Sequence, residues 1–316
     1  MFTKNFTEIT KEDTNIAGGK GASLGEMTGA GIPIPPGFVI LTYGFDCLLH
    51  SNQLVSEIDS ALHGVNHEDA NSVEQASEKI KGLILNAKIP PDLETEILNA
   101  FENLNCEFVA VRSSATAEDG SSTSWAGELE SFLNTTKETL LENVKKCWSS
   151  LFTPRAIFYR FEKKLHETPV SVAVVIQKMV NSEVSGVAFS VHPVTEDRNQ
   201  LIIEAGLGLG EAIVSGSLTP DSYIIDKQDF SIIDISIAEQ ERKMVKKING
   251  GNEWIDVPES ERSLQKLNPE QIIELARLVV QIENHYGFPV DVEWAKEQKR
   301  FFITQSRPIT TLTSRP

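Results

Sequence analysis

The sequence predicts an α+β protein built of two lobes, and three observations support this fold class. The chain has 316 residues, 40% of them hydrophobic, which is enough for two lobes of roughly 100–200 residues each. Helical periodicity fills the segment from about Thr42 to Leu104. Beyond Met179 the pattern changes to short strands separated by turns. We therefore expect residues 1–180 to form the first lobe, 181–312 the second, and 313–316 the start of a linker.

In the first lobe the pattern predicts both helices and strands. A glycine-rich stretch, Ala17–Gly21, precedes a predicted helix from Ala22 to Gly29. Pro90-Pro91-Asp92 opens a further helix, because apolar residues follow it at helical spacing. The remaining predictions are strands at 38–41, 107–112, 131–133 and 170–177, and helical structure at 137–165.

In the second lobe the pattern predicts strands at 184–190, 200–205, 222–226 and 230–237. Asn268, Pro269 and Gln271 have the types and spacing of an N-cap, a first-position proline and an N3 glutamine. They predict a helix that runs to His285 and stops at Gly287. Residues 290–295 and 300–306 then form a predicted hairpin around positions 297–299.

Composition excludes several classes of protein. A formal net charge of −16 argues against nucleic acid or anionic lipid as a partner. Three widely spaced cysteines predict reduced thiols without a zinc or redox centre. The N-terminal residues contain no apolar signal core, and the longest apolar run, Val172–Ile176, is too short to span a bilayer. We expect a soluble, cytoplasmic protein with no membrane contact.

Lys20 lies in a tight glycine cluster, where backbone N–H groups and an ammonium can approach a phosphate closely. The cluster is not a Walker A loop, because Gly21 follows Lys20 where that motif has Ser or Thr, and position 14 is Thr instead of Gly. Taken alone, a surface turn is the more frequent explanation of such a cluster.

Arg112 ends a predicted strand and precedes a hydroxyl-rich loop of small residues, Ser113–Gly127. A loop of this kind, containing Ser124 and Gly127, can fold over phosphates and exclude water. The alternative is a mobile polar loop whose arginine pairs with a surface acid.

The predicted hairpin carries the third group of polar residues. Side chains alternate along a strand, so Asp291 and Glu293 share one face, as do Gln305 and Arg307. A turn centred on Gln298 places Asp291 opposite Gln305. Carboxylate and amide oxygens suit Mg²⁺, and an arginine suits phosphate. A cross-strand salt-bridge ladder is an equal alternative.

Two further segments carry weaker signals. The run from Gly206 to Glu211 is glycine-rich, but no βαβ unit with a matching acid follows it, so we reject a Rossmann fold. His192 precedes a proline and has no serine or cysteine nucleophile at a recognisable spacing, so we interpret it as structural.

Taken in order, these segments resemble the N-terminal nucleotide-binding domain of the phosphoenolpyruvate synthase and pyruvate phosphate dikinase family, of which rifampin phosphotransferase is a relative. The matching segments are Gly18–Gly21, Val111–Asp119, Ser124–Glu128 with Phe132–Asn134, Gly208–Ala212 with Thr219–Asp221, Asp291-x-Glu293, and Gln305-x-Arg307-Pro308. The resemblance covers nearly the whole chain. It implies an ATP-grasp fold, in which two α+β lobes clamp ATP between them.

The resemblance also implies the roles of individual residues. Lys20, Arg112 and Arg307 would hold the phosphates and carry catalysis, and Glu293 and Gln305 would bind Mg²⁺. Further ATP contacts are implied for Ser124, Gly127, Gln177, Met179, Val180 and Asp291, with residues 177–180 as the hinge that meets adenine. A triphosphate of charge about −4 needs several such cations during transfer.

The family reaction passes phosphate from ATP to a histidine on a separate domain and then to pyruvate on a third. This sequence has no Thr-x-His-Ala-like acceptor motif. We therefore expect only the ATP half-reaction of a dikinase, with a histidine domain and a pyruvate-binding domain as partners in the same or another chain. Two alternatives stay open: the same domain of rifampin phosphotransferase, and a stand-alone nucleotide-binding module without catalysis.

Overall fold

The computed structural model describes residues 1–116, 119–120, 123–124, 130–162, 171–310 and 312, with no account of the side chains at 119, 120, 123 and 124. The chain forms two compact units. The first comprises Met1–Glu26 and Pro36–Met179, and the second comprises Met27–Pro35 and Val180–Pro316. Residues 27–35, assigned to the first lobe from sequence, pack with the second unit, where the Ile303 N–H donates to the Pro33 carbonyl.

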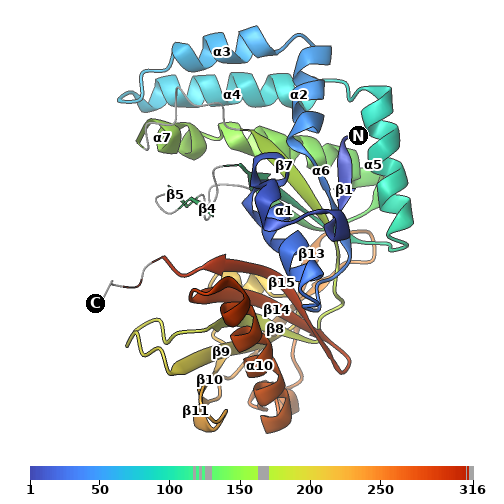
Figure 1. Ribbon diagram of the computed structural model, residues 1–316. Helices are drawn as coiled ribbons and strands as arrows, with labels where there is room; N and C mark the ends of the chain where they lie inside the picture. The colour runs from blue at the N-terminus through green and yellow to red at the C-terminus, as the bar shows by residue number, and fades with distance from the viewer. Residues whose placement is uncertain (117–118, 121–122, 125–129, 163–170, 311, 313–316) are drawn as a thin grey trace. The chain divides into compact units, whose positions relative to one another are not determined.

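The first unit contains a five-stranded antiparallel sheet (Figure 1). Its strands, in spatial order, are β1 (Thr3–Asn5), β2 (Gly37–Ile40), β7 (Val172–Lys178), β3 (Val109–Ala115) and β6 (Ser131–Thr135). Its α-helices are α1 (Thr14–Gly29), α2 (Thr42–Ser51), α3 (Val55–His63), α4 (Ala70–Asn86), α5 (Pro91–Asn103), α6 (Lys137–Ser149) and α7 (Pro154–Glu162). Short 3-10 turns at Phe6–Glu8, Lys11–Asp13 and Ser150–Phe152 and a two-stranded ribbon, β4 (Asp119–Gly120) with β5 (Thr123–Ser124), complete it.

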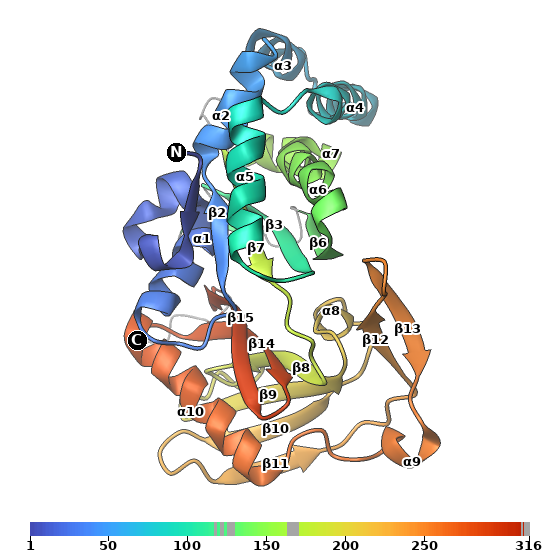
Figure 2. The ribbon, with the colours of Figure 1, turned by 90° about the vertical axis from the view of Figure 1, so that its right-hand side faces the viewer.

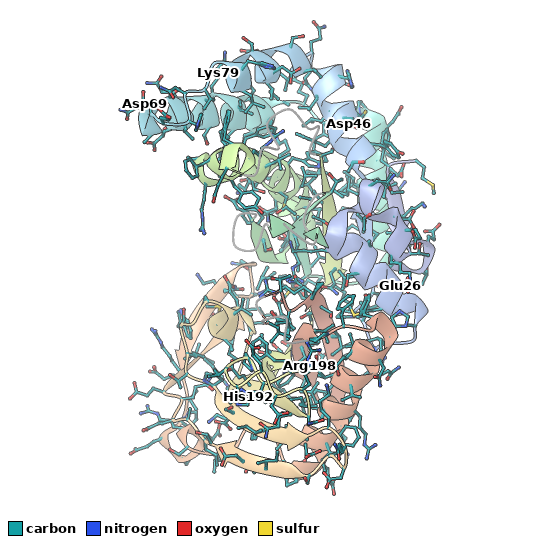
Figure 3. The ribbon with its side chains drawn as sticks, turned by 60° about the vertical axis from the view of Figure 1, so that its left-hand side comes forward. Glu26, Asp46, Asp69, Lys79, His192 and Arg198 are labelled. Atoms are coloured by element: carbon teal, nitrogen blue, oxygen red, sulfur yellow. The ribbon has the colours of Figure 1, made fainter. Side chains whose placement is uncertain are left out.

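Helices α2, α5 and α6 pack on the strands of this sheet, α4 packs on α6 and α7, and α3 packs on α4; together they build the core. Trp148 of α6 is fully buried and stacks on Phe45 of α2, with ring centroids 5.8 Å apart. Alternate strand residues such as Val174 and Ile176 point into the same cluster. Figure 3 labels Asp69, whose carboxylate accepts the Asn71 N–H and so caps the start of α4. The helical region predicted between residues 42 and 104 is therefore the scaffold on one side of the sheet.

Helix α1 covers the opposite face, as Figure 2 shows, and glycines allow its close approach. Gly18 (φ 68°, ψ 172°) interrupts the helix in a conformation that only glycine adopts easily. A Cβ at Gly18 would lie 2.2 Å from the carbonyl oxygen of Ser114. The sequence predicts a loop here with a helix from Ala22, but helix forms on both sides of Gly18, because the glycines let it lie directly against β3.

The second unit is built on a six-stranded antiparallel sheet. Its spatial order is β11 (Ile232–Ser236), β10 (Asp221–Asp226), β9 (Gln200–Leu207), β8 (Val184–Phe189), β14 (Val290–Glu297) and β15 (Arg300–Pro308). A separate hairpin, β12 (Arg242–Lys246) with β13 (Asn252–Asp256), and the helices α8 (Glu211–Val214), α9 (Glu259–Arg262) and α10 (Pro269–Tyr286) complete the unit. The hairpin is a finding that the sequence pattern did not predict, since its strands have five residues each and carry several charged side chains.

Helix α10 covers one face of this sheet (Figure 1) and has the predicted ends. The Asn268 side chain accepts the Gln271 N–H, the Gln271 side chain accepts the Asn268 N–H, and Gly287 ends the helix at φ 76°. Its buried residues, including Leu275 and Val279, pack on the sheet. The opposite face of the sheet carries Glu204 and Glu293 beside apolar residues such as Val187.

A buried polar network joins the segment after β11 to the sheet. Asp221 accepts hydrogen bonds from the Tyr223 hydroxyl (2.8 Å) and the backbone N–H groups of Ala238 and Lys266. The Lys266 ammonium lies 3.2 Å from the same carboxylate, and both side chains are fully buried. Gln240 bonds to both the N–H and the carbonyl of Leu207, which fixes the end of β9. No helix in the described part of the chain is long and apolar enough to cross a membrane.

Gly18 gives a direct test of how α1 packs. We expect Gly18→Ala to lower the free energy of unfolding by about 2–4 kcal/mol, because it combines an unfavourable φ with a collision against β3. Gly82 in α4 is the control, since a Cβ there meets nothing within 4 Å. Gly82→Ala should leave stability unchanged or raise it by up to about 1 kcal/mol. Equal urea midpoints for the two variants, measured by circular dichroism, would contradict this packing.

Candidate functional site

In the first unit the candidate residue Lys20 lies directly after the break in α1. Gly18 ends the first part of the helix, so Lys20 occupies the first turn of the second part. Ser114 of β3 holds this turn on both sides, since its hydroxyl donates to the Ala17 carbonyl (2.9 Å) and accepts the Gly21 N–H (3.1 Å). Lys20 is therefore fixed at a helix start, where the backbone dipole is positive.

Arg112 lies on the same face of the first sheet as Ser114, because the two are separated by one residue of β3. Strand β3 extends three residues beyond the predicted end at Arg112, through Ala115. This extension brings Ser114 to α1, and with it Lys20 and Arg112 come to the same side of the sheet. The sequence alone did not predict that they share a face.

Gln177 belongs to this face as well. Its Cα partners are Gly37 on β2 and Ala110 on β3, two residues from Arg112. The side chain is 3% exposed, and its Nε2 has no hydrogen-bond partner among the residues that the structure describes. A buried amide donor without an acceptor is costly, so this atom is suited to an acceptor supplied by a ligand.

Four further candidate residues are Met179, Val180, Ser124 and Gly127, and the structure describes the first two fully. The Met179 N–H donates to the Phe108 carbonyl, so β7 continues beside the start of β3. Val180, assigned to the second unit, is buried. Ser124 lies in β5 but its side chain is not described, and Gly127 falls outside the described residues.

In the second unit the hairpin carries the predicted residues on one face. Asp291 is the Cα partner of Arg307, and Glu293 is the Cα partner of Gln305. The predicted pairing of Asp291 with Gln305 is therefore wrong by two residues. The turn is centred between Gln298 and Lys299, and a β-bulge adds one residue, Thr304, between the two paired segments.

The bulge decides which face Gln305 and Arg307 occupy. Before it, Trp294 pairs with Ile303, and both are buried. Without an extra residue, regular alternation would place Thr304 opposite Glu293 and turn Gln305 to the other face. Thr304 shifts the register, so the amide and the guanidinium lie beside the carboxylates.

Asp291 and Arg307 form an ion pair across the hairpin. Arg307 Nε donates to Asp291 Oδ2 at 2.8 Å, and Nη2 lies 2.7 Å from the same oxygen. Burial raises the pKa of Asp291, while Arg307 acts to lower it and Glu293 to raise it. The arginine side chain is 44% exposed and the aspartate 11%, so the carboxylate is the fixed partner.

Glu204 is a residue of this face that sequence reasoning missed. It is the Cα partner of Val187 on β8, and Val187 is in turn the partner of Glu293 on β14. The row therefore runs from Glu204 through Val187 and Glu293 to Gln305, on one face. Burial raises the pKa of Glu204, and the Asp291 carboxylate raises it further. In the sequence Glu204 simply follows an apolar run, and no motif around it indicates a functional residue.

The two weaker sequence signals have local explanations in the structure. Gly208 (φ 88°) is followed by α8, which has four residues, so the glycine-rich run does not open a dinucleotide-binding helix. His192, labelled in Figure 3, accepts the backbone N–H groups of Val194 and Thr195 through Nδ1 and so organises a turn. These hydrogen bonds give His192 a structural part in the turn. Within the described part of the chain, no group of three or more His, Cys, Asp or Glu side chains could hold a metal ion.

Known proteins match almost the whole chain. A probable phosphoenolpyruvate synthase of Methanocaldococcus jannaschii is 45% identical, over 96% of this chain and 26% of its own length. The corresponding protein of Methanothermobacter thermautotrophicus is 42% identical, over 97% and 46%. Rifampicin phosphotransferase of Bacillus subtilis is 38% identical, over 96% and 35%. The chain spans less than half the length of each of these relatives.

The family described as pyruvate phosphate dikinase, AMP/ATP-binding domain, matches residues 14–316. This range includes the Lys20 turn and Arg112 in the first unit, and the Glu204 row and the hairpin in the second. The chain belongs to the pyruvate phosphate dikinase AMP/ATP-binding domain family.

Proposed function

We propose that this chain is an ATP-grasp domain that binds Mg-ATP and starts a phosphoryl transfer to a histidine on another domain, as part of a phosphoenolpyruvate synthase. The observation that carries the proposal is the hairpin, where the bulge at Thr304 brings Gln305 and Arg307 to the face of Asp291 and Glu293. Oxygen ligands for a hard cation and a guanidinium for phosphate then lie side by side.

The first unit supplies cations and a recognition group. Lys20, at the start of a helix segment, and Arg112, on the adjacent strand, suit phosphate oxygens, since a helix start and two positive side chains attract anions. Gln177 Nε2, buried without an acceptor among the described residues, suits a ring nitrogen of adenine. Residues 177–180 are the proposed hinge that meets the base.

The second unit fits a magnesium ion. Side chains of residues directly opposite on an antiparallel pair are about 5 Å apart at Cβ, so Glu293 and Gln305 can both reach one ion. Mg²⁺ binds proteins through one or two carboxylates together with substrate phosphates, so a larger carboxylate cluster is not required. When bound, Mg²⁺ neutralises phosphate charge that develops during transfer.

Arg307 is held by Asp291 in an orientation that suits phosphate. The two contacts with Asp291 use the Nε and Nη2 side of the guanidinium and one carboxylate oxygen. Arginine has five N–H donors in a rigid fork, so a fixed edge also fixes the direction of the rest. Catalysis by these residues is positioning and charge stabilisation. We assign Lys20, Arg112 and Arg307 to this role.

The histidine acceptor and the pyruvate site are proposed to lie outside this chain. The chain spans 26% and 46% of two relatives named as probable phosphoenolpyruvate synthases, so those proteins contain much more sequence. The second candidate, that the final acceptor is the antibiotic, comes from the relatives named rifampicin phosphotransferase. A binding module without catalysis is the third candidate. The bulged hairpin argues against it, since Glu293, Gln305 and Arg307 suit transfer as well as binding.

The test of the proposed function combines this chain, ATP labelled at the β-phosphate, Mg²⁺ and a separately produced histidine domain of a phosphoenolpyruvate synthase. We expect AMP and a labelled histidine. ADP with no label on the histidine would indicate a simple kinase. Binding of ATP without transfer, repeated with the histidine domain of the M. jannaschii relative, would reject catalysis in favour of a binding module.

Glu293 distinguishes metal-assisted transfer from binding alone. We expect Glu293→Ala to slow phosphoryl transfer at least 100-fold, by analogy with the loss of one group that stabilises transition-state charge. ATP affinity should fall much less. The control is Glu297→Ala, at the turn end of the same strand. An unchanged transfer rate in Glu293→Ala would reject the metal assignment.

Deletion of Thr304 tests the bulge. The deletion should return β15 to regular alternation and turn Gln305 and Arg307 to the α10 side, so Mg-ATP affinity should fall by at least tenfold. The matched control is Thr304→Ala, which keeps the extra residue and should bind like the native chain. Titration calorimetry measures both. Native affinity in the deletion variant would show that the bulge does not position these side chains.

A further inference from the structure

Glu204 is a half-buried carboxylate in the second unit, and no neighbouring group among the residues that the structure describes stabilises its negative charge. In the described part of the chain it has no hydrogen-bond or ion-pair partner, and its charged neighbour is the like-charged Asp291. Such an arrangement is unfavourable, because burial and a nearby negative charge both oppose ionisation of a carboxyl group. A carboxylate kept in this position is suited to a positive group that arrives with a ligand.

Strand register directs Glu204 toward the proposed metal position. Val187 of β8 separates Glu204 from Glu293, and all three side chains lie on the same face. Neighbouring strands are about 4.8 Å apart, so the two glutamate backbones are about 10 Å apart. Two glutamate side chains that lean toward each other across Val187 can face a single hydrated ion, because Mg²⁺ retains several of its waters in protein sites.

We propose that Glu204 is an outer carboxylate for the divalent cation of the bound nucleotide, accepting hydrogen bonds from metal-bound water while Glu293 and Gln305 provide the inner oxygens. The proposal rests on the proposed function of this face. A divalent cation relieves the repulsion between Glu204 and Asp291, whereas a neutral ribose hydroxyl would leave that repulsion in place. The alignment of Glu204 with Glu293 and the negative charge of Asp291 together favour the metal over the sugar as the group that Glu204 serves.

The test measures metal affinity directly and does not depend on turnover. Binding of Mn²⁺ to the full chain, saturated with a non-hydrolysable ATP analogue, is followed by electron paramagnetic resonance. We expect Glu204→Gln to weaken Mn²⁺ binding about 10- to 100-fold, the range found when groups that support metal ligands are replaced. Affinity for the analogue in EDTA should stay within about twofold of the native value, since the proposed role acts only through the metal.

The matched control is Glu253→Gln on β13, which removes one carboxylate of the same unit outside the six-stranded sheet. It should bind Mn²⁺ like the native chain. Native-like Mn²⁺ affinity in Glu204→Gln would overturn the proposal. So would an equal loss of analogue affinity with and without metal, which would assign Glu204 to the nucleoside. If Glu204→Gln changes the circular dichroism spectrum, Glu204→Asp, which keeps the charge, replaces it and should retain most of the metal affinity.

This design separates the two levels of inference. Failure of the native chain to bind the analogue with Mn²⁺ would reject the proposed function itself. Normal binding by the native chain together with an unaffected Glu204→Gln variant would reject only the role of Glu204.

Discussion

The strict alternation of side chains along β-strands is the constraint on which both groups of candidate residues depend. In each unit helices build an apolar core on one face of the sheet, and the candidate polar residues lie on the other face, which in the first unit also carries α1. In the second unit α10 buries the face of Trp294 and Ile303, which leaves Glu204 and Glu293 opposite. In the first unit the helical core takes Ile176, which leaves Gln177 and Arg112 on the side of α1.

In the hairpin one extra residue, Thr304, determines which face of the sheet Gln305 and Arg307 occupy. The two-residue turn at Gln298 and Lys299 sets a register in which Gln305 and Arg307 would face the helix, where a guanidinium is costly. Thr304 restores them to the carboxylate face. The Asp291–Arg307 pair that results is half exposed on the arginine side and contributes little to stability. Its consequence is an arginine with a fixed direction, which is what recognition of a phosphate requires.

Some residues of the motifs shared with the family serve the fold. Asp221, the last residue of Thr219-Pro220-Asp221, is fully buried and organises Tyr223, Ala238 and Lys266. A buried ion pair of this kind is weak evidence for stability, because desolvation offsets much of the attraction. It fixes where the chain returns to the sheet, and with Gln240 it defines the end of β9, the strand that carries Glu204.

The local features of this protein follow directly from its amino-acid sequence. The ends of α10 could be predicted because capping involves neighbours in the chain, and the shared face of Asp291 and Glu293 followed from the two-residue period of a strand. The register of the hairpin, the helix on both sides of Gly18, and the alignment of Glu204 with Glu293 were set by the tertiary structure. These depend on how residues far apart in the chain pair and pack. A single bulge or a single close backbone contact changes the register of strands and the path of a helix. Neither can be recognised from the periodicity of apolar residues in the sequence.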